Sequence, residues 1–291
     1  MARVGCVIYD VGILDFTKIS FLFQRCLKTL IKEPSNSELD IILLNDFHSY
    51  IYLDEVLGKL YSICRDVLLE QSLHMLPINI YFGSFFKEAM KWDLLYVSDQ
   101  SQTGTFQANK YELFKQPCII NKSEGTADEV KGDDPNRYDV SALGGTFDHI
   151  HDGHKILLSI ASFLTKHRLI VGITVEELLV NKRFKEYLES FEDRCNNVTQ
   201  FLKNLKPTLN VEISPLKDVC GPTGKVPEIQ SLIVSRETVS GGKQVNETRN
   251  SLGMNLLEIC VVNVLGGREN DGWSEKLSST EIRKIAKESH N

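Results

Sequence analysis

The sequence has 291 residues, of which 42% are hydrophobic and 25% charged, a composition typical of a folded protein with about two domains. Its formal net charge of −6 argues against a broad nucleic-acid-binding surface, because such a surface carries an excess of Lys and Arg. No apolar stretch approaches the roughly 18 residues of a membrane-spanning helix, and the N-terminus lacks an apolar run of signal length. The seven cysteines are scattered without a C-x-x-C pair, which favours reduced thiols and a cytoplasmic location.

The first 120 residues predict a small α/β domain. Residues 17–32 and 53–70 show the helical spacing of apolar residues, and short apolar runs typical of strands occur at GCVIYDV, DIILLN, PINIYFG and LLYVS. No group of residues with catalytic chemistry stands out in this half, so its role is left open.

A charged segment over residues 121–137 has Gly and Pro breakers and almost no large apolar residue, which predicts a linker. The domain that follows, residues 138–291, alternates strand-like and helical stretches. Buried apolar strands that alternate with helices predict a Rossmann-like, doubly wound parallel sheet. Ligands of such sheets bind at the carboxyl ends of the strands, where the winding reverses. The expected strands are 138–145, 168–174, 209–214, 229–235 and 256–265, and the expected helices are 153–165, 191–205 and one from about 279.

The most informative stretch is GGTFDHIHDGH, residues 144–154, in which three of the seven histidines fall within six positions. Gly144 and Gly145 end a strand, and their missing side chains let another group approach the backbone. His151 and His154 lie three residues apart across the first turn of a helix, where free N–H groups and the dipole favour an anion. A phosphate-binding turn accounts for all these features together. There are two alternatives. One is a metal site formed by the three histidines, and the other is a helix start in which the histidines are incidental.

A hydroxyl-rich stretch, LSSTEIR, opens the last predicted helix. Ser278 as the N-cap with Glu281 three residues later has the pattern of a capping box. Several hydroxyls, free amides and a guanidinium at one helix start predict a second anion site. Capping alone does not require the further polar residues of this stretch, which are Ser279, Thr280 and Arg283.

With these two motifs, the second half of the chain resembles the nucleotidyltransferase superfamily, which pairs H-x-G-H near the first strand with S-x-T-x-x-R at the last helix. Further pieces resemble the eukaryotic and archaeal phosphopantetheine adenylyltransferases. The resemblance runs from about residue 138 to 289, and the chain looks like the monofunctional, fungal type. The pieces are DVCGP at 218–222, IVSRET at 233–238, and Gly241-Gly242 with Asn246 and Arg249. Arg236 departs from the acidic or prolyl residue expected at its position.

The resemblance implies transfer of AMP from ATP to 4′-phosphopantetheine, which gives dephospho-coenzyme A and pyrophosphate in the penultimate step of coenzyme A biosynthesis. Mg²⁺ would arrive with ATP, and no metal would be held by the protein itself. Dephospho-coenzyme A or coenzyme A would bind as product or inhibitor, and other enzymes of the pathway are candidate partners.

The resemblance also implies roles for individual residues. The catalytic set is Thr146, His154, Lys182 and Arg283, with Arg183 as the alternative to Lys182. Residues expected to bind the nucleotide and its phosphates are Gly144, Gly145, Phe147, His151, Glu237, Asn246, Arg249, Ser278, Ser279 and Thr280.

Two other functions remain open. One is adenylyl or cytidylyl transfer to a different phosphorylated acceptor, such as nicotinamide mononucleotide or a phosphorylated alcohol. The other is a non-catalytic scaffold subunit of the pathway that binds partners through residues 1–120.

Overall fold

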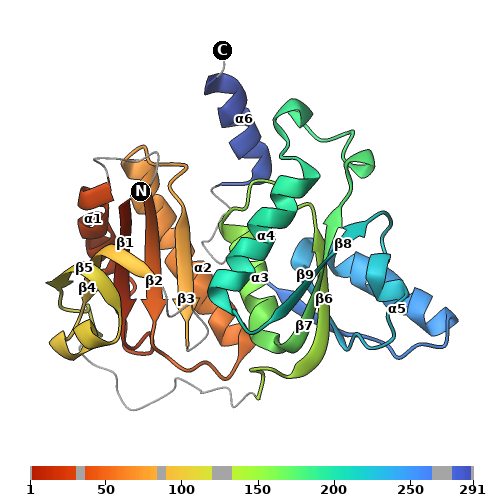
Figure 1. The fold of residues 1–291 in the computed structure, drawn as a ribbon, viewed down its shortest axis with the longest axis horizontal. Helices are drawn as coiled ribbons and strands as arrows, with labels where there is room; N and C mark the ends of the chain where they lie inside the picture. Colours follow the sequence, from red (N-terminus) through yellow and green to blue (C-terminus); the bar gives the residue numbers. More distant parts are fainter. Residues whose placement is uncertain (1, 31–36, 84–89, 120–132, 264–276, 290–291) are drawn as a thin grey trace. The chain divides into compact units, whose positions relative to one another are not determined.

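The computed structural model describes residues 2–30, 37–83, 90–119, 133–263 and 277–289 (Figure 1). The chain divides into two units. One comprises Met1–His48 and Glu55–Gly132, and the other comprises Ser49–Asp54 and Asp133–Asn291. The predicted boundaries place residues 49–54 in the first domain. They stay a prediction, because most of the expected linker lies outside the described residues.

The first unit contains a five-stranded parallel sheet in the order β3-β2-β1-β4-β5. The apolar runs predicted as strands correspond to β1 through β4. Strand β5 was not predicted, because its sequence, QANKYEL, is largely polar and its side chains are exposed or half-buried at the sheet edge. The strands are β1 (Ala2–Ile8), β2 (Ser37–Leu43), β3 (Ile78–Phe82), β4 (Lys91–Val97) and β5 (Gln107–Leu113), and the helices are α1 (Ile19–Leu30) and α2 (Tyr50–Glu70).

The second unit contains another five-stranded parallel sheet, in the order β10-β9-β6-β7-β8. The doubly wound parallel sheet expected from the sequence is therefore confirmed. Its strands are β6 (Tyr138–Gly145), β7 (Thr165–Thr174), β8 (Asn210–Leu216), β9 (Ser231–Ser235) and β10 (Glu258–Val262), and its helices are α3 (Asp152–Leu164), α4 (Phe191–Leu205), α5 (Val239–Ser251) and α6 (Ser279–Ser289).

Helices cover both faces of the second sheet, with α3 and α4 on one side and α5 on the other (Figure 1). This explains why the strands read as continuous apolar runs rather than alternating ones. On the α5 side, Val245 packs against the strand residues Ala142, Ile170, Leu232 and Val234. Part of the buried core of this unit thus lies between α5 and the sheet.

Numbered within each unit, both sheets have the strand order 3-2-1-4-5, which is also that of dinucleotide-binding folds. The winding reverses between β1 and β4 in the first unit and between β6 and β9 in the second. In the first unit the chain itself covers the end of β1. The Gln116 side chain accepts from the Tyr9 N–H at 3.0 Å and donates to the Asp10 carbonyl at 2.7 Å, and Leu14 pairs with Cys118.

Candidate functional site

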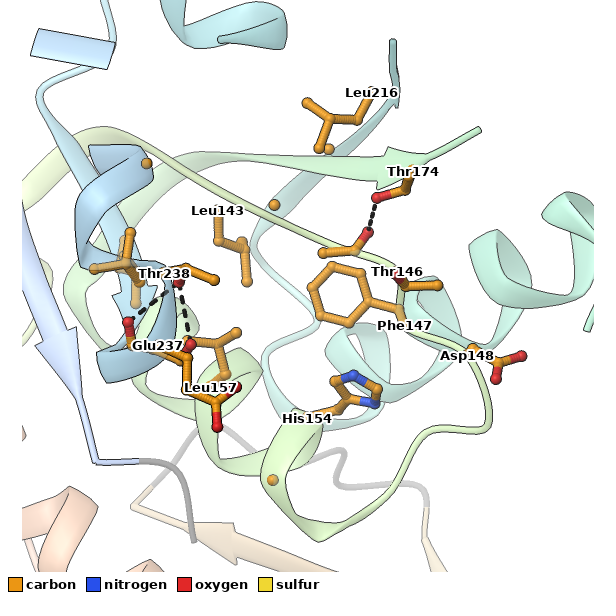
Figure 2. A pocket seen from close by; sticks show the side chains of 18 of the residues that line it. Leu143, Thr146, Phe147, Asp148, His154, Leu157, Thr174, Leu216, Glu237 and Thr238 are labelled. Atoms are coloured by element: carbon orange, nitrogen blue, oxygen red, sulfur yellow. Dashed lines mark hydrogen bonds between the residues drawn. The ribbon is translucent and has the colours of Figure 1, made fainter. Parts of the chain in front are cut away.

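A cavity of about 610 Å³ lies in the second unit at the carboxyl ends of β6, β7 and β9, where the winding reverses (Figure 2). Residues of both sequence motifs line it, although more than a hundred positions separate the motifs in the chain. The predicted site residues that line the cavity are Gly144, Gly145, Thr146, Phe147, His151, His154, Lys182, Glu237, Ser278, Ser279, Thr280 and Arg283.

The turn after β6 has an unusual backbone. Phe147 and His149 have φ angles of 51° and 45°, in the left-handed region that side chains other than glycine rarely adopt. Phe147 is fully buried, and its ring covers Gly145, where an added Cβ would lie 3.1 Å from the ring. We expected these glycines to let another group approach the backbone, and at Gly145 this group is the chain's own Phe147. Strained turns of this kind are typical of functional sites.

Two histidines of the first motif are neighbours in the cavity. The ring centroids of His151 and His154 lie 3.9 Å apart. The Phe147 ring lies beside His154, with 5.2 Å between the ring centroids (Figure 2). Burial, with the nearby His151 and Lys182, lowers the pKa of His154 well below 6.5. His154 is therefore neutral at pH 7, and it interacts with an anion as a hydrogen-bond donor rather than as a charge.

The third histidine of this motif does not line the cavity. The His149 ring Nε2 lies 2.8 Å from the Tyr187 carbonyl, and the His149 N–H donates to the Glu189 carboxylate at 2.6 Å. The three histidines thus do not converge on one point. Across the described part of the chain, no group of three His, Cys, Asp or Glu side chains is placed to bind a metal ion.

The N-terminus of α3 opens at the cavity with His151 as its N-cap. The His151 side chain makes no capping hydrogen bond, so the N–H groups of the first turn are left to other acceptors. At the start of α6, by contrast, the Ser278 hydroxyl accepts from the Glu281 N–H at 3.3 Å. Ser278 is therefore the N-cap that the sequence predicted, whereas the Glu281 carboxylate pairs with Lys284.

A buried ion pair joins the two motifs. Arg283 Nη1 pairs with Asp148 Oδ2, and both side chains are nearly inaccessible to solvent. The Ser279 hydroxyl donates to the Asp148 carbonyl at 2.7 Å, which gives a second link between the same segments. The remaining contacts of the guanidinium run from Nε to the Arg183 carbonyl at 2.9 Å and from Nη2 to the Thr280 hydroxyl at 3.1 Å. Asp148 was missed in the sequence, where it is one acidic residue inside GGTFDHIH.

The loop after β7 contributes a lysine to the cavity wall. Lys182 lines the cavity, whereas the Arg183 guanidinium lies over the Phe184 ring at 5.5 Å. This arrangement favours Lys182 over its neighbour as the residue that faces a ligand.

Comparisons with known proteins cover the part of the chain that carries this site. Residues 142–285 match the family model described as cytidylyltransferase-like. The chain is 50% identical over 286 residues to the phosphopantetheine adenylyltransferase of Saccharomyces cerevisiae, an alignment that covers 95% of this chain and 93% of the yeast protein. The chain belongs to the phosphopantetheine adenylyltransferases.

Two further relatives differ in how much of this chain they match. An uncharacterized protein of Schizosaccharomyces pombe is 41% identical over 218 residues, which is 70% of this chain and 67% of that protein. The phosphopantetheine adenylyltransferase of Methanopyrus kandleri is 35% identical over 147 residues, which is 50% of this chain and 90% of the archaeal protein.

One buried arginine of this family member was not predicted as part of the site. Arg194 of α4 is inaccessible to solvent and donates from Nη1 to the Thr146 carbonyl at 2.9 Å and to the Thr174 carbonyl at 2.8 Å. Its Nε donates to the Glu189 carbonyl at 3.2 Å. Arg194 thus fixes the backbone at the carboxyl ends of β6 and β7 from behind the cavity.

Two residues carried over from the family resemblance lie elsewhere. The Asn246 side chain donates to the Leu257 carbonyl at 3.0 Å and accepts from the Leu257 N–H at 2.8 Å. Arg249 is fully buried and donates to four main-chain carbonyls, those of Thr223, Val226, Pro227 and Asn255. Neither side chain lines the cavity, and both hold α5 to the loops around it. Among the described helices, none is long and apolar enough to cross a membrane.

Proposed function

We propose that this chain transfers AMP from ATP to 4′-phosphopantetheine, giving dephospho-coenzyme A and pyrophosphate, and that residues 138–291 carry the chemistry. The observation that carries the proposal is that both anion-binding motifs line one cavity at the point where the sheet reverses its winding. We further propose that the protein acts in the cytoplasm, since all seven cysteines are free thiols.

The phosphates of ATP bind where α3 begins. The first-turn amides of α3, its dipole, the neutral imidazole of His154 and the neighbouring His151 ring offer hydrogen bonds to these phosphates. Lys182 supplies the charge that offsets the departing pyrophosphate. Ser279, Thr280 and Arg283 shape the opposite wall. Their mutual contacts and those with Asp148 set the geometry before any ligand binds.

The acceptor needs no general base. A phosphate monoester has a second pKa of about 6 and is mostly dianionic at neutral pH. The low pKa of His154 agrees with a role in hydrogen bonding rather than in proton removal. The reaction is then a direct in-line attack of the acceptor phosphate on the α-phosphorus, with Thr146 orienting the acceptor. Positioning and electrostatic stabilisation supply the rate enhancement.

Magnesium fits this site as a companion of ATP. The carboxylates that line the cavity are Asp148 and Glu237, and Asp148 is already paired with Arg283. Mg²⁺ is commonly bound through one or two carboxylates together with substrate phosphates and water. In this cavity the nucleotide phosphates would supply most of its ligands, and the ion would neutralise part of their charge.

Dephospho-coenzyme A shares the pantetheine arm of the acceptor and binds the same cavity as product, and coenzyme A binds it as an inhibitor. Other enzymes of the pathway are proposed partners of the first unit. Inhibition by coenzyme A that is competitive with 4′-phosphopantetheine would support the shared cavity, and non-competitive inhibition would contradict it.

The deciding experiment measures pyrophosphate release from Mg-ATP with 4′-phosphopantetheine, nicotinamide mononucleotide and phosphocholine, the last also with CTP. Turnover confined to 4′-phosphopantetheine, with dephospho-coenzyme A as product, is expected. Turnover with another acceptor would keep the mechanism and overturn the substrate. Folded protein that binds ATP without turning over any acceptor would instead support a non-catalytic scaffold.

A further inference from the structure

Six residues from the first half of the chain belong to the second unit. These are Ser49–Asp54, which include the first turn of α2. The Tyr50 N–H donates to the Asp134 carboxylate at 2.9 Å, and Leu53 and Asp54 are buried. The second unit, which carries the cavity, thus includes the segment Ser49–Asp54 from well before its main part, Asp133–Asn291.

Asp54 holds the end of a strand of the second sheet. Its Oδ2 accepts from the N–H of Asn263 at 2.8 Å. Asn263 directly follows β10, whose last residue Val262 is in register with Ser235 at the end of β9. The carboxylate of Asp54 therefore fixes the chain just beside the carboxyl end of β9.

Asn263 in turn holds an arginine of the cavity. The Arg236 Nε donates to Asn263 Oδ1, and Arg236 lines the cavity immediately after β9. The Nη groups of this guanidinium make no hydrogen bond or ion pair with another described residue. Asp54 thus fixes the backbone of Asn263, and Asn263 binds Nε of the half-buried Arg236 side chain. The two Nη groups of Arg236 are left to bind a ligand.

Arg236 comes directly after β9, whereas the phosphate-binding residues are at the starts of α3 and α6. Figure 2 shows its neighbours Glu237 and Thr238 across the pocket from Thr146 and Asp148. A nucleotide whose phosphates lie at the start of α3 extends its ribose and base toward β9, since the crevice of such a sheet opens between the two central strands. A planar guanidinium is suited to both parts, because it stacks on aromatic rings and donates to hydroxyls.

We propose that Arg236 binds the nucleoside half of the nucleotide and that Asp54 positions Arg236 through Asn263. Arg236 replaces the acidic or prolyl residue expected from the family pattern, and the contact to Asn263 gives this replacement a structural role. The inference rests on the proposed function only in taking ATP as the nucleotide. It gives the first half of the chain a positioning part in nucleotide binding.

Calorimetric binding of ATP and of inorganic tripolyphosphate separates the two halves of the ligand. Arg236→Gln is expected to weaken ATP binding about tenfold, the loss that follows from one charge-assisted contact, and to leave tripolyphosphate binding unchanged. An equal loss for both ligands would place Arg236 on the phosphates and overturn the proposal, as would no loss for either. Wild-type protein that binds neither ligand would instead contradict the proposed function.

A double-mutant cycle tests the positioning role of Asp54. Asp54→Ala is expected to weaken ATP binding in the same direction, and the double variant Asp54→Ala/Arg236→Gln to bind no more weakly than Arg236→Gln alone. Additive losses would overturn the positioning role. Asp134→Ala is the matched control, because it removes the other polar anchor of residues 49–54 without touching Asn263. An equal loss of ATP affinity in Asp134→Ala would mean that ATP binding depends on the whole segment 49–54 and not on Asp54 in particular.

Asn263→Ala provides a second route if Asp54→Ala does not fold. This change removes the acceptor of Arg236 and keeps the backbone N–H that donates to Asp54. It is expected to weaken ATP binding and to spare tripolyphosphate binding, as Arg236→Gln does. Unchanged ATP binding would contradict the relay.

Discussion

Asp148 and Arg283 stand 135 positions apart in the sequence and form a buried ion pair that joins the turn after β6 to helix α6. The pair fixes the distance between the two anion-binding motifs. Each motif has its own helix start, and this contact together with the Ser279 hydrogen bond holds them as two walls of one cavity.

Removing the charge of Asp148 is expected to be strongly destabilising. Asp148→Asn keeps the size of the side chain and leaves the Arg283 guanidinium buried without its counter-ion, a change that costs about 3–5 kcal/mol. Urea unfolding followed by fluorescence measures the loss. Asp139→Asn is the control, because Asp139 is 59% exposed and its contacts with Lys166 at 3.9 Å and His167 at 3.5 Å lie at the surface. Equal free energies of unfolding for Asp148→Asn and the wild type would contradict a stabilising pair.

Replacing Arg194 by lysine tests whether its guanidinium supports the backbone of the site. Arg194→Lys keeps a charge but loses the planar fork that contacts the carbonyls of Thr146 and Thr174 together. We expect a stability loss of about 1–3 kcal/mol, the cost of leaving such buried groups unpaired, and a lower kcat because Thr146 is less well held. Arg168→Lys, at a surface pair with Glu212, should change neither quantity. Unaltered kcat in Arg194→Lys would remove Arg194 from the support of the site.

Two glycines of the cavity wall should respond oppositely to alanine. A Cβ at Gly145 would lie 3.1 Å from the Phe147 ring, whereas one at Gly241 meets nothing within 4 Å. Gly145→Ala is expected to cost about 1–3 kcal/mol of stability through overpacking and to lower activity, because Phe147 contacts His154. Gly241→Ala lies within α5 and is expected to stabilise the protein by about 0.5–1 kcal/mol. Thermal unfolding of both variants measures these changes. Similar shifts of the unfolding temperature in the two variants would show that the Phe147 ring moves to accommodate the added methyl group.

Much of the second unit could be predicted, because its central strands β6, β7 and β9 carry apolar, largely buried runs. Strand β5 of the first unit could not, since an exposed edge strand needs no apolar run. Both motifs were identified because glycines, histidines and hydroxyls cluster locally at helix starts. Asp148 and Arg194 were missed for a physical reason. Their roles depend on a side chain or on carbonyl groups far away in the sequence, and no local spacing encodes such contacts.

The same reason explains why the sequence predicted a wrong position for Asn246 and Arg249. Family resemblance suggests that both lie near the nucleotide, yet their side chains bond to main-chain groups around α5. A polar residue of a motif can bind main-chain groups of its own protein or bind a ligand. Only the atoms that it contacts in the structure distinguish these two roles.

The low pKa of His154 links the site to the pH dependence of stability. Burial, with His151 and Lys182 nearby, lowers the pKa of the folded state well below 6.5. In the unfolded chain the same imidazole titrates near 6.5. Between these two values the unfolded state binds a proton that the folded state does not. The contribution of His154 to stability is therefore complete above pH 6.5 and is lost as the pH falls.

His154→Asn removes this titration. We expect the free energy of unfolding of the wild type, relative to the variant, to decrease as the pH falls from about 7.5 to about 5.5, by at most about 1.4 kcal/mol per pH unit. Parallel urea titrations across this range measure the difference. His167→Asn is the control, because His167 is 66% exposed at the surface and lies outside the cavity. A wild-type-to-variant difference that stays constant with pH would mean that His154 takes up its proton equally in both states, and the neutral hydrogen-bonding role would then fall.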